Sequence, residues 1–161
     1  MAAEDQRFRK PAVGGRQTFV RHVDLQTRME WQRIDVANTD RLREIVAEHG
    51  WPGRSLVGDD GAHHAWLIAQ HADRQLDFQR EALSFLADAV SRGEAAERDL
   101  AYLTDRVRMN EGREQVYGTQ IAEVKDGSGV PWPVEDPANL DARRAAVGLP
   151  PFEEYSRDWP S

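Results

Sequence analysis

The chain contains 161 residues, of which 40% are hydrophobic and 30% are charged, and its formal net charge is −7. This length supports one domain with a hydrophobic core but not two ordinary domains, and the composition is typical of a folded globular protein rather than a disordered one. Cysteine is absent, which excludes disulfides, thiolate catalysis and metal centres with cysteine ligands.

The charge pattern and the apolar runs limit the possible partners. Basic residues lie among acidic ones and form no basic stripe of the kind that binds phosphates. The longest apolar run, residues 65–69, is far shorter than the roughly 20 residues that span a bilayer, and the first fifteen residues lack the apolar core of a secretion signal. We therefore expect no nucleic acid, no membrane partner and a cytoplasmic location.

The first third of the chain is predicted to be a polar lead followed by helices. Residues 1–15 contain Pro11 and a glycine pair and are expected to be a flexible lead, while residues 16–161 form a single domain. A first helix is predicted over 18–36 and a second over 39–49, with Asn38 or Thr39 as its N-cap and Gly50 ending it. The glycine-rich stretch 50–61 is predicted to be a loop.

The remaining pattern predicts a helical bundle with a small β element. A central helix extends to about residue 91, with a break near 72–73, and a third clear helix covers 95–110. β-branched residues, a KDGSG turn and prolines then predict a short β-hairpin or extended arm near residues 115–134, in which Trp132 is expected to be a buried anchor. A short helix over 137–147 and a C-terminal turn complete a mostly α, single-domain bundle, and Phe152, Tyr155 and Trp159 are expected to pack on it.

The segment HHAWLIAQHADRQ places polar side chains on a predicted core face. At about 100° per residue, His64, His71 and Gln75 share one face with Leu67 and Ile68. An unpaired buried polar group costs about 1–3 kcal/mol, so such groups are normally hydrogen-bonded, metal-ligating or catalytic.

Three readings of His71 stay open at this point. It is a core histidine bonded within the protein, a general acid or base, or a metal ligand. His64 and His71 are two helical turns apart, about 10 Å along the axis, which is too far for one ion without further ligands. We therefore predict no metal site and no cofactor.

Two further polar groups follow along the chain. Asp105-Arg106 predicts either an ion pair that fixes the helices or an arginine that grips a substrate carboxylate. In the strand predicted over 115–124, Gln115, Tyr117 and Thr119 share one face and form a wall suited to a polar ligand, while Gln120 faces the other way.

The ordered phrases GWPGRSLVG, AWLIAQHAD, LAYLTDRV, QVYGTQ and DARRAAVGLPPFEEY carry a family resemblance. Over about residues 31–155 the chain resembles a bacterial family of small proteins of unknown function, marked by QHAD and YGTQ motifs. The positions that match its motif blocks are Trp51, Gln70, His71, Asp73, Asp105, Arg106, Tyr117, Gly118, Thr119 and Gln120. The resemblance implies no particular activity.

The leading hypothesis is a small, cofactor-independent enzyme that acts on a polar small molecule or peptide as an isomerase, cyclase or hydrolase. His71 and Tyr117 are the predicted catalytic residues. The predicted substrate-binding residues are His64, Gln70, Gln75, Arg106, Gln115, Thr119 and Gln120. The alternatives are a non-catalytic ligand-binding or protein-interaction module, in which the two motifs interlock, and a metalloprotein with histidine ligands. The oligomeric state stays open.

Overall fold

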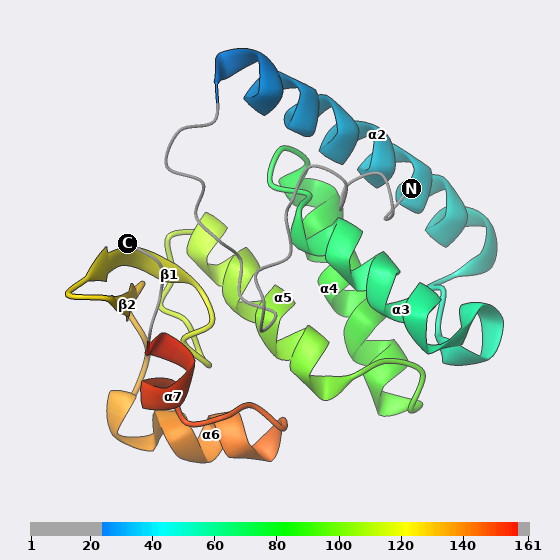
Figure 1. The fold of residues 1–161 in the computed structure, drawn as a ribbon. Coiled ribbons are helices and arrows are strands. Elements are labelled where there is room, and N and C mark those ends of the chain that lie inside the picture. Colours follow the sequence, from blue (N-terminus) through cyan, green and yellow to red (C-terminus); the bar gives the residue numbers. More distant parts are fainter. Residues whose placement is uncertain (1–23, 158–161) are drawn as a thin grey trace.

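The structure, a computed structural model, describes residues 24–157. It confirms a mostly α, single-domain architecture with one short antiparallel hairpin (Figure 1). The predicted lead over residues 1–15 and Trp159 lie outside the described residues. None of the helices in the described part is both long and apolar enough to span a membrane.

Helix α2 (Leu25–His49) is one continuous helix where two were predicted. It begins at Asp24, whose carboxylate accepts the backbone N–H of Thr27 at 3.0 Å. The predicted cap at Asn38 or Thr39 is wrong: both residues are buried inside the helix, and the Thr39 hydroxyl donates to the carbonyl of Asp35 at 2.7 Å. A threonine hydroxyl can donate to a carbonyl of the preceding turn inside a helix, so Thr39 does not mark a helix N-terminus.

Helices α3 (Arg54–Gln70) and α4 (Leu76–Ser91) take the place of the predicted central helix. The expected break is confirmed and lies between Gln70 and Leu76. The predicted loop over 50–61 is partly wrong, because α3 begins at Arg54 and kinks at Gly58, where φ is +73°. The break ends the predicted polar stripe, and His64 lies exposed on α3 instead of facing the core.

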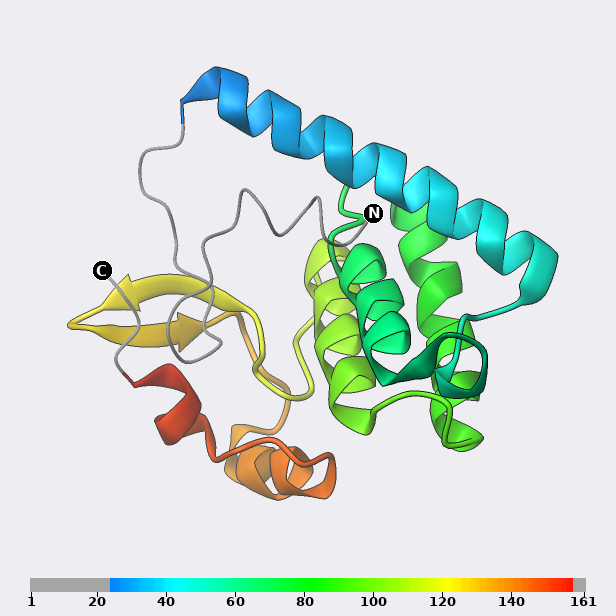
Figure 2. The same ribbon diagram turned by 45° about the vertical axis from the view of Figure 1, so that its right-hand side comes forward.

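Helix α5 (Glu97–Asn110) has the core on one side and the C-terminal region on the other (Figure 2). Leu103 and Val107 join the apolar core that α2, α3 and α4 share, while the fully buried Asp105 contacts the C-terminal loop. This two-sided burial makes α5 the element that joins the two parts of the molecule. The largest aliphatic and aromatic members of the core are Leu42, Val46, Trp51, Trp66, Ile68, Phe78, Leu86, Leu103 and Val107.

The C-terminal region begins with an irregular loop and a hairpin. Strands β1 (Ile121–Lys125) and β2 (Ser128–Pro131) pair antiparallel around Asp126 and Gly127, both at positive φ, which defines a two-residue type I′ turn. The strand predicted over 115–124 therefore begins only at residue 121. The prediction of a buried Trp132 is wrong, because its side chain is 45% exposed.

Three short helical segments end the described chain. The 3-10 helix η1 (Pro137–Asn139) leads into α6 (Leu140–Ala146), and α7 (Phe152–Ser156) follows. Figure 1 shows α6 and α7 beside the hairpin, and α7 contacts β2. These segments supply the side chains that hold the loop before the hairpin.

Candidate functional site

The loop that carries Tyr117, Gly118, Thr119 and Gln120, here called the YGTQ loop, is folded around one buried carboxylate. Asp105 is 0% exposed, and its oxygens accept the backbone N–H groups of Val116 at 2.7 Å, Tyr117 at 3.1 Å and Thr119 at 2.9 Å. The Thr119 hydroxyl donates a fourth hydrogen bond at 2.9 Å. Burial raises the pKa of Asp105 in spite of these hydrogen bonds.

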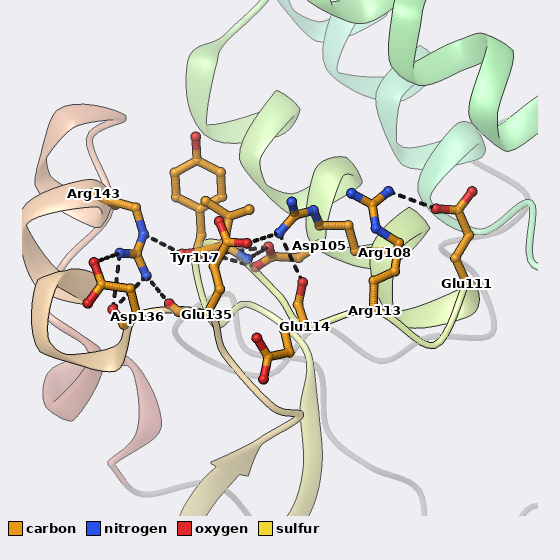
Figure 3. A network of polar contacts seen from close by, with 10 residues as sticks. Asp105, Arg108, Glu111, Arg113, Glu114, Tyr117, Glu135, Asp136 and Arg143 are labelled. Carbon is orange, nitrogen blue, oxygen red and sulfur yellow. Dashed lines mark hydrogen bonds and ion pairs between the residues drawn. The ribbon is translucent and has the colours of Figure 1, made fainter.

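The carbonyl groups of the same loop are bonded to side chains of the C-terminal helices. The three pairs are Val116 with Arg143 at 2.9 Å, Tyr117 with Arg144 at 2.7 Å, and Thr119 with Tyr155 at 2.8 Å. Figure 3 shows the Arg143 end of this network, where the guanidinium also contacts Asp136. A loop without regular secondary structure thus satisfies its backbone through side chains.

Arg144 is fully buried and has no carboxylate partner among the described residues. Its guanidinium lies over the rings of Tyr155 at 4.8 Å and Phe152 at 5.6 Å, and it also donates to the carbonyl of Pro150 at 2.7 Å. Burial lowers its pKa. Carbonyl dipoles and aromatic faces take the place of a counter-ion here.

The side chain of Gln115 closes the loop from within. Its Oε1 accepts the N–H of Gln120 at 2.7 Å, and its Nε2 donates to the carbonyls of Gln120 at 3.0 Å and Trp132 at 2.9 Å. Gly118, at φ +64°, turns the chain out of an extended path. The predicted ligand wall does not form, because Gln115 and Thr119 are buried in internal bonds and only the half-buried Tyr117 ring points away from Asp105 (Figure 3).

The residues of the α3–α4 connection, Gln70 to Gln75, here called the QHAD turn, are joined to the YGTQ loop by an arginine. Arg106 holds both carboxylate oxygens of Asp73, at 3.0 and 2.8 Å, and donates to Oε1 of Gln120 at 2.8 Å. Gln120 in turn donates to the Thr119 hydroxyl at 2.9 Å. The two motifs therefore interlock through one continuous chain of hydrogen bonds.

Asp73 differs from Asp105 because it has a positive partner. Burial raises its pKa, but the charge of Arg106 and hydrogen bonds from Asn110, Arg106 and Gln79 more than offset this, so the pKa of Asp73 is lowered. Its side chain is 41% exposed. The ion pair predicted as the structural reading of Arg106 is present, and its partner is Asp73.

His71 lies at the rim of a small depression between α2 and the QHAD turn. The depression has a volume of about 10 Å³, room for about one water molecule. His71 is half-buried, and its backbone N–H caps α3 by donating to the carbonyl of Ile68 at 3.1 Å. The lining residues are Asp35, Val36, Thr39, His71, Ala72, Arg74 and Gln75.

Two glutamine oxygens near this turn accept no hydrogen bond from the part of the chain that the structure describes. Gln75 Nε2 donates to the carboxylate of Asp40 at 2.6 Å, which fixes the orientation of the amide, and the buried Gln75 Oε1 accepts from no described residue. The same holds for the buried Oε1 of Gln70. An acceptor left unsatisfied in this way costs about 1–3 kcal/mol, so these two buried atoms keep unused hydrogen-bonding capacity in the QHAD turn.

The structure thus brings His71 and Gln75 into one depression and leaves the other predicted site residues outside it. His64 is exposed on α3, and neither Tyr117 nor Arg106 lines the depression. Within residues 24–157, no group of three or more histidine, aspartate or glutamate side chains is placed to hold a metal ion.

One histidine–carboxylate pair escaped the sequence reasoning. His63 Nδ1 lies 3.1 Å from Oδ2 of the buried Asp99, and the imidazole ring lies 4.8 Å from the ring of Trp66. The two residues are 36 positions apart on different helices, and an aspartate in the first turn of a helix is expected there for its charge alone. No local spacing signals such a pair.

Comparison with other proteins adds a family but no activity. No curated protein and no solved structure matches the chain. A family model described as a family of unknown function, DUF6624, matches residues 2–159, which is nearly the whole chain. The chain belongs to the DUF6624 family.

Proposed function

We propose that this protein is a non-catalytic binding module that takes up a polar small molecule or peptide group at the depression beside His71. In this proposal the YGTQ loop is structural and the QHAD turn is the binding element. The observation that carries it is the buried Oε1 of Gln75, which accepts no hydrogen bond from the described residues and belongs to a residue that lines that depression.

The internal hydrogen bonds of the YGTQ loop support the structural half of the proposal. The side chains of Gln115, Thr119 and Gln120 are buried and each is bonded to groups of the protein itself. A ligand would have to displace these bonds before it could use the same atoms. Each exchange is unfavourable where the ligand cannot replace the lost bond with a better one.

The chemistry of the depression defines the ligand class. Gln75 Oε1 requires an N–H or O–H donor, and the depression has room for one small group of this kind. A primary amine, a primary amide or the amino end of a peptide fits, with the rest of the ligand lying over His71 and the exposed Arg74. These properties agree with a polar small molecule or peptide.

The test is a thermal-shift and NMR screen of amines, primary amides and short peptides against the full chain. Ligands that bind are expected to lose affinity in Gln75→Met, which keeps the length of the side chain but removes the acceptor. His64→Ala is the control and is expected to leave the affinity unchanged, since it removes an exposed histidine on α3 that does not line the depression. Binding that is unchanged in Gln75→Met, or no binding at all, would contradict the proposal.

Acid–base catalysis by His71 is the second candidate, because the half-buried His71 and Asp35 both line the depression. In that case His71→Gln abolishes turnover of a bound ligand while its affinity changes little. A bound ligand that stays chemically unchanged with the wild-type protein leaves only the binding function. Tyr117 is not the partner in this version, since it lies outside the depression.

We further infer that the QHAD and YGTQ blocks mark the family and that the protein is bacterial and cytoplasmic, with no nucleic-acid partner. The motifs support the first inference because their side chains interlock. The net charge of −7 supports the last.

A further inference from the structure

Within residues 24–157, the hairpin has one covered edge and one open edge. On the β2 side, α7 contacts the strand, and the chain just beyond it is bridged to Gln115 through Val134. No other element of the described chain makes comparable contacts with the outer edge of β1. An unpaired strand edge presents free N–H and C=O groups to another strand.

The turn fixes which groups of β1 face outward. In a type I′ turn the carbonyl of Lys125 accepts the N–H of Ser128, so the backbone groups of Lys125 point toward β2. Pairs alternate along an antiparallel ladder, so the N–H and C=O of Val124 point away from β2. Val124 is therefore the residue that a further strand would pair with.

The two residues beside Val124, Glu123 and Lys125, carry opposite charges. Glu123 faces Val130 and Lys125 faces Ser128 across the hairpin, and both charged side chains are exposed. Neither makes an ion pair within residues 24–157. Residues two apart in a strand lie on the same face of the sheet, so Glu123 and Lys125 flank Val124 on one face.

We propose that the open edge of β1 pairs antiparallel with β1 of a second copy, centred on Val124. In this register the two Val124 residues exchange their outward hydrogen bonds, and Glu123 of each copy lies opposite Lys125 of the other. Two reciprocal ion pairs then form about a twofold axis. A register centred on Glu123 or Lys125 would require backbone groups that are already hydrogen-bonded to β2.

The pairing involves a short edge and makes a weak dimer. It is independent of the binding function proposed for the QHAD turn, since the hairpin contributes no residue to that depression. Lysine on an edge strand ordinarily discourages pairing with other chains. Here Glu123 favours the register centred on Val124, because each Glu123 then lies opposite Lys125 of the other copy. In a shifted register these charges have no opposite partner.

The test is sedimentation equilibrium of the full chain over a dilution series, with three charge variants of the hairpin and a mixture of two of them. Glu123→Lys and Lys125→Glu each turn two attractions into two repulsions and are expected to raise the Kd of self-association by about tenfold or more. The charge-swapped double variant restores it at unchanged net charge. An equimolar mixture of the two single variants associates like the wild type, because each then meets its opposite.

Matched controls separate this contact from net charge and from folding. Glu81→Lys and Arg92→Glu change the net charge equally at exposed positions outside the hairpin and are expected to leave the Kd within about twofold, since surface charges there have no partner across the contact. Val124→Pro removes the outward N–H that the hairpin itself does not use and abolishes association, whereas Val124→Thr keeps it. A wild type that is monomeric throughout, or single variants that associate like the wild type, would overturn the proposal.

Discussion

The YGTQ loop and the QHAD turn are both rich in polar side chains, yet they use them in opposite ways. In the loop, backbone groups of residues 116, 117, 119 and 120 are bonded to side chains from the loop itself, α5, α6 and α7. In the turn, Asp73 is 41% exposed, and the side-chain oxygens of Gln70 and Gln75 accept from no residue in 24–157. A polar motif therefore serves folding where internal partners use up its hydrogen-bonding capacity, and binding where capacity is left over.

The largest expected effect comes from removing the charge at the centre of the loop. Asp105→Asn keeps the shape of the side chain but leaves one acceptor oxygen and an NH₂ group that faces backbone N–H donors. We expect it to lower the free energy of unfolding by about 3–5 kcal/mol, since two or more buried donors lose their acceptor. Urea denaturation measures this change.

Asp99→Asn is the matched control for this prediction. Asp99 is buried on the same helix, but its carboxylate accepts from His63 alone among the hydrogen bonds of the described residues, and an amide oxygen can replace it. The expected loss is about 1 kcal/mol. If the two variants are equally stable, the carboxylate of Asp105 is not what holds the loop.

The next effect concerns the bend of the loop. Gly118→Ala places a Cβ at φ +64°, 3.4 Å from Phe152 and 3.5 Å from Leu140, which are ordinary contact distances, so it is expected to cost the backbone strain of about 1–2 kcal/mol. Gly112→Ala is the matched control, since it has a similar φ of +71° and meets no atom within 4 Å. We expect the two variants to lose similar stability in thermal melting curves. A clearly larger loss at Gly118 would mean that the added methyl group does not fit against Phe152 and Leu140.

The smallest effect lies in the QHAD turn. Asp73→Asn breaks the bidentate pair with Arg106 and is expected to cost about 1 kcal/mol at neutral pH, because the pair is partly screened by solvent. The pKa of Asp73 is lowered from 3.8, so its contribution is present above that pH and is lost as the pH falls through the lowered value. The stabilities of wild type and variant, measured by urea denaturation from pH 7 to pH 2, should therefore converge at the acid end. Curves that stay parallel would show that Arg106 does not act through the charge of Asp73.

Periodicity and end signals were enough to predict the helical fold. The α3–α4 break, helix α5 and the turn at Asp126-Gly127 follow from local chemistry and are confirmed. The continuous α2 was missed because Thr39 is as good at bonding inside a helix as at starting one. The local sequence pattern predicts well where helices form, but it does not show whether a threonine hydroxyl caps a helix or bonds to a carbonyl within one.

The candidate site was predicted less well, because its contacts join residues that are far apart in the sequence. His71 and Gln75 do lie together, as their spacing suggested, although they flank a helix break rather than sharing a helix. Alternation placed Gln115 and Thr119 on an open face, whereas a carboxylate from α5 draws the loop inward and buries them. Nothing near Asp105 in the sequence indicates which backbone N–H groups donate hydrogen bonds to its carboxylate.

Residue-resolved hydrogen exchange of the native protein tests the contrast between the two motifs most directly. The amides of Val116, Tyr117 and Thr119 lie outside regular secondary structure, and ordinary loop amides exchange quickly. We expect these three to exchange as slowly as the amide of Leu103 in the core, and to become fast in Asp105→Asn. Fast exchange in the wild-type protein would contradict the account, because the YGTQ loop would then be open to ligands like the QHAD turn.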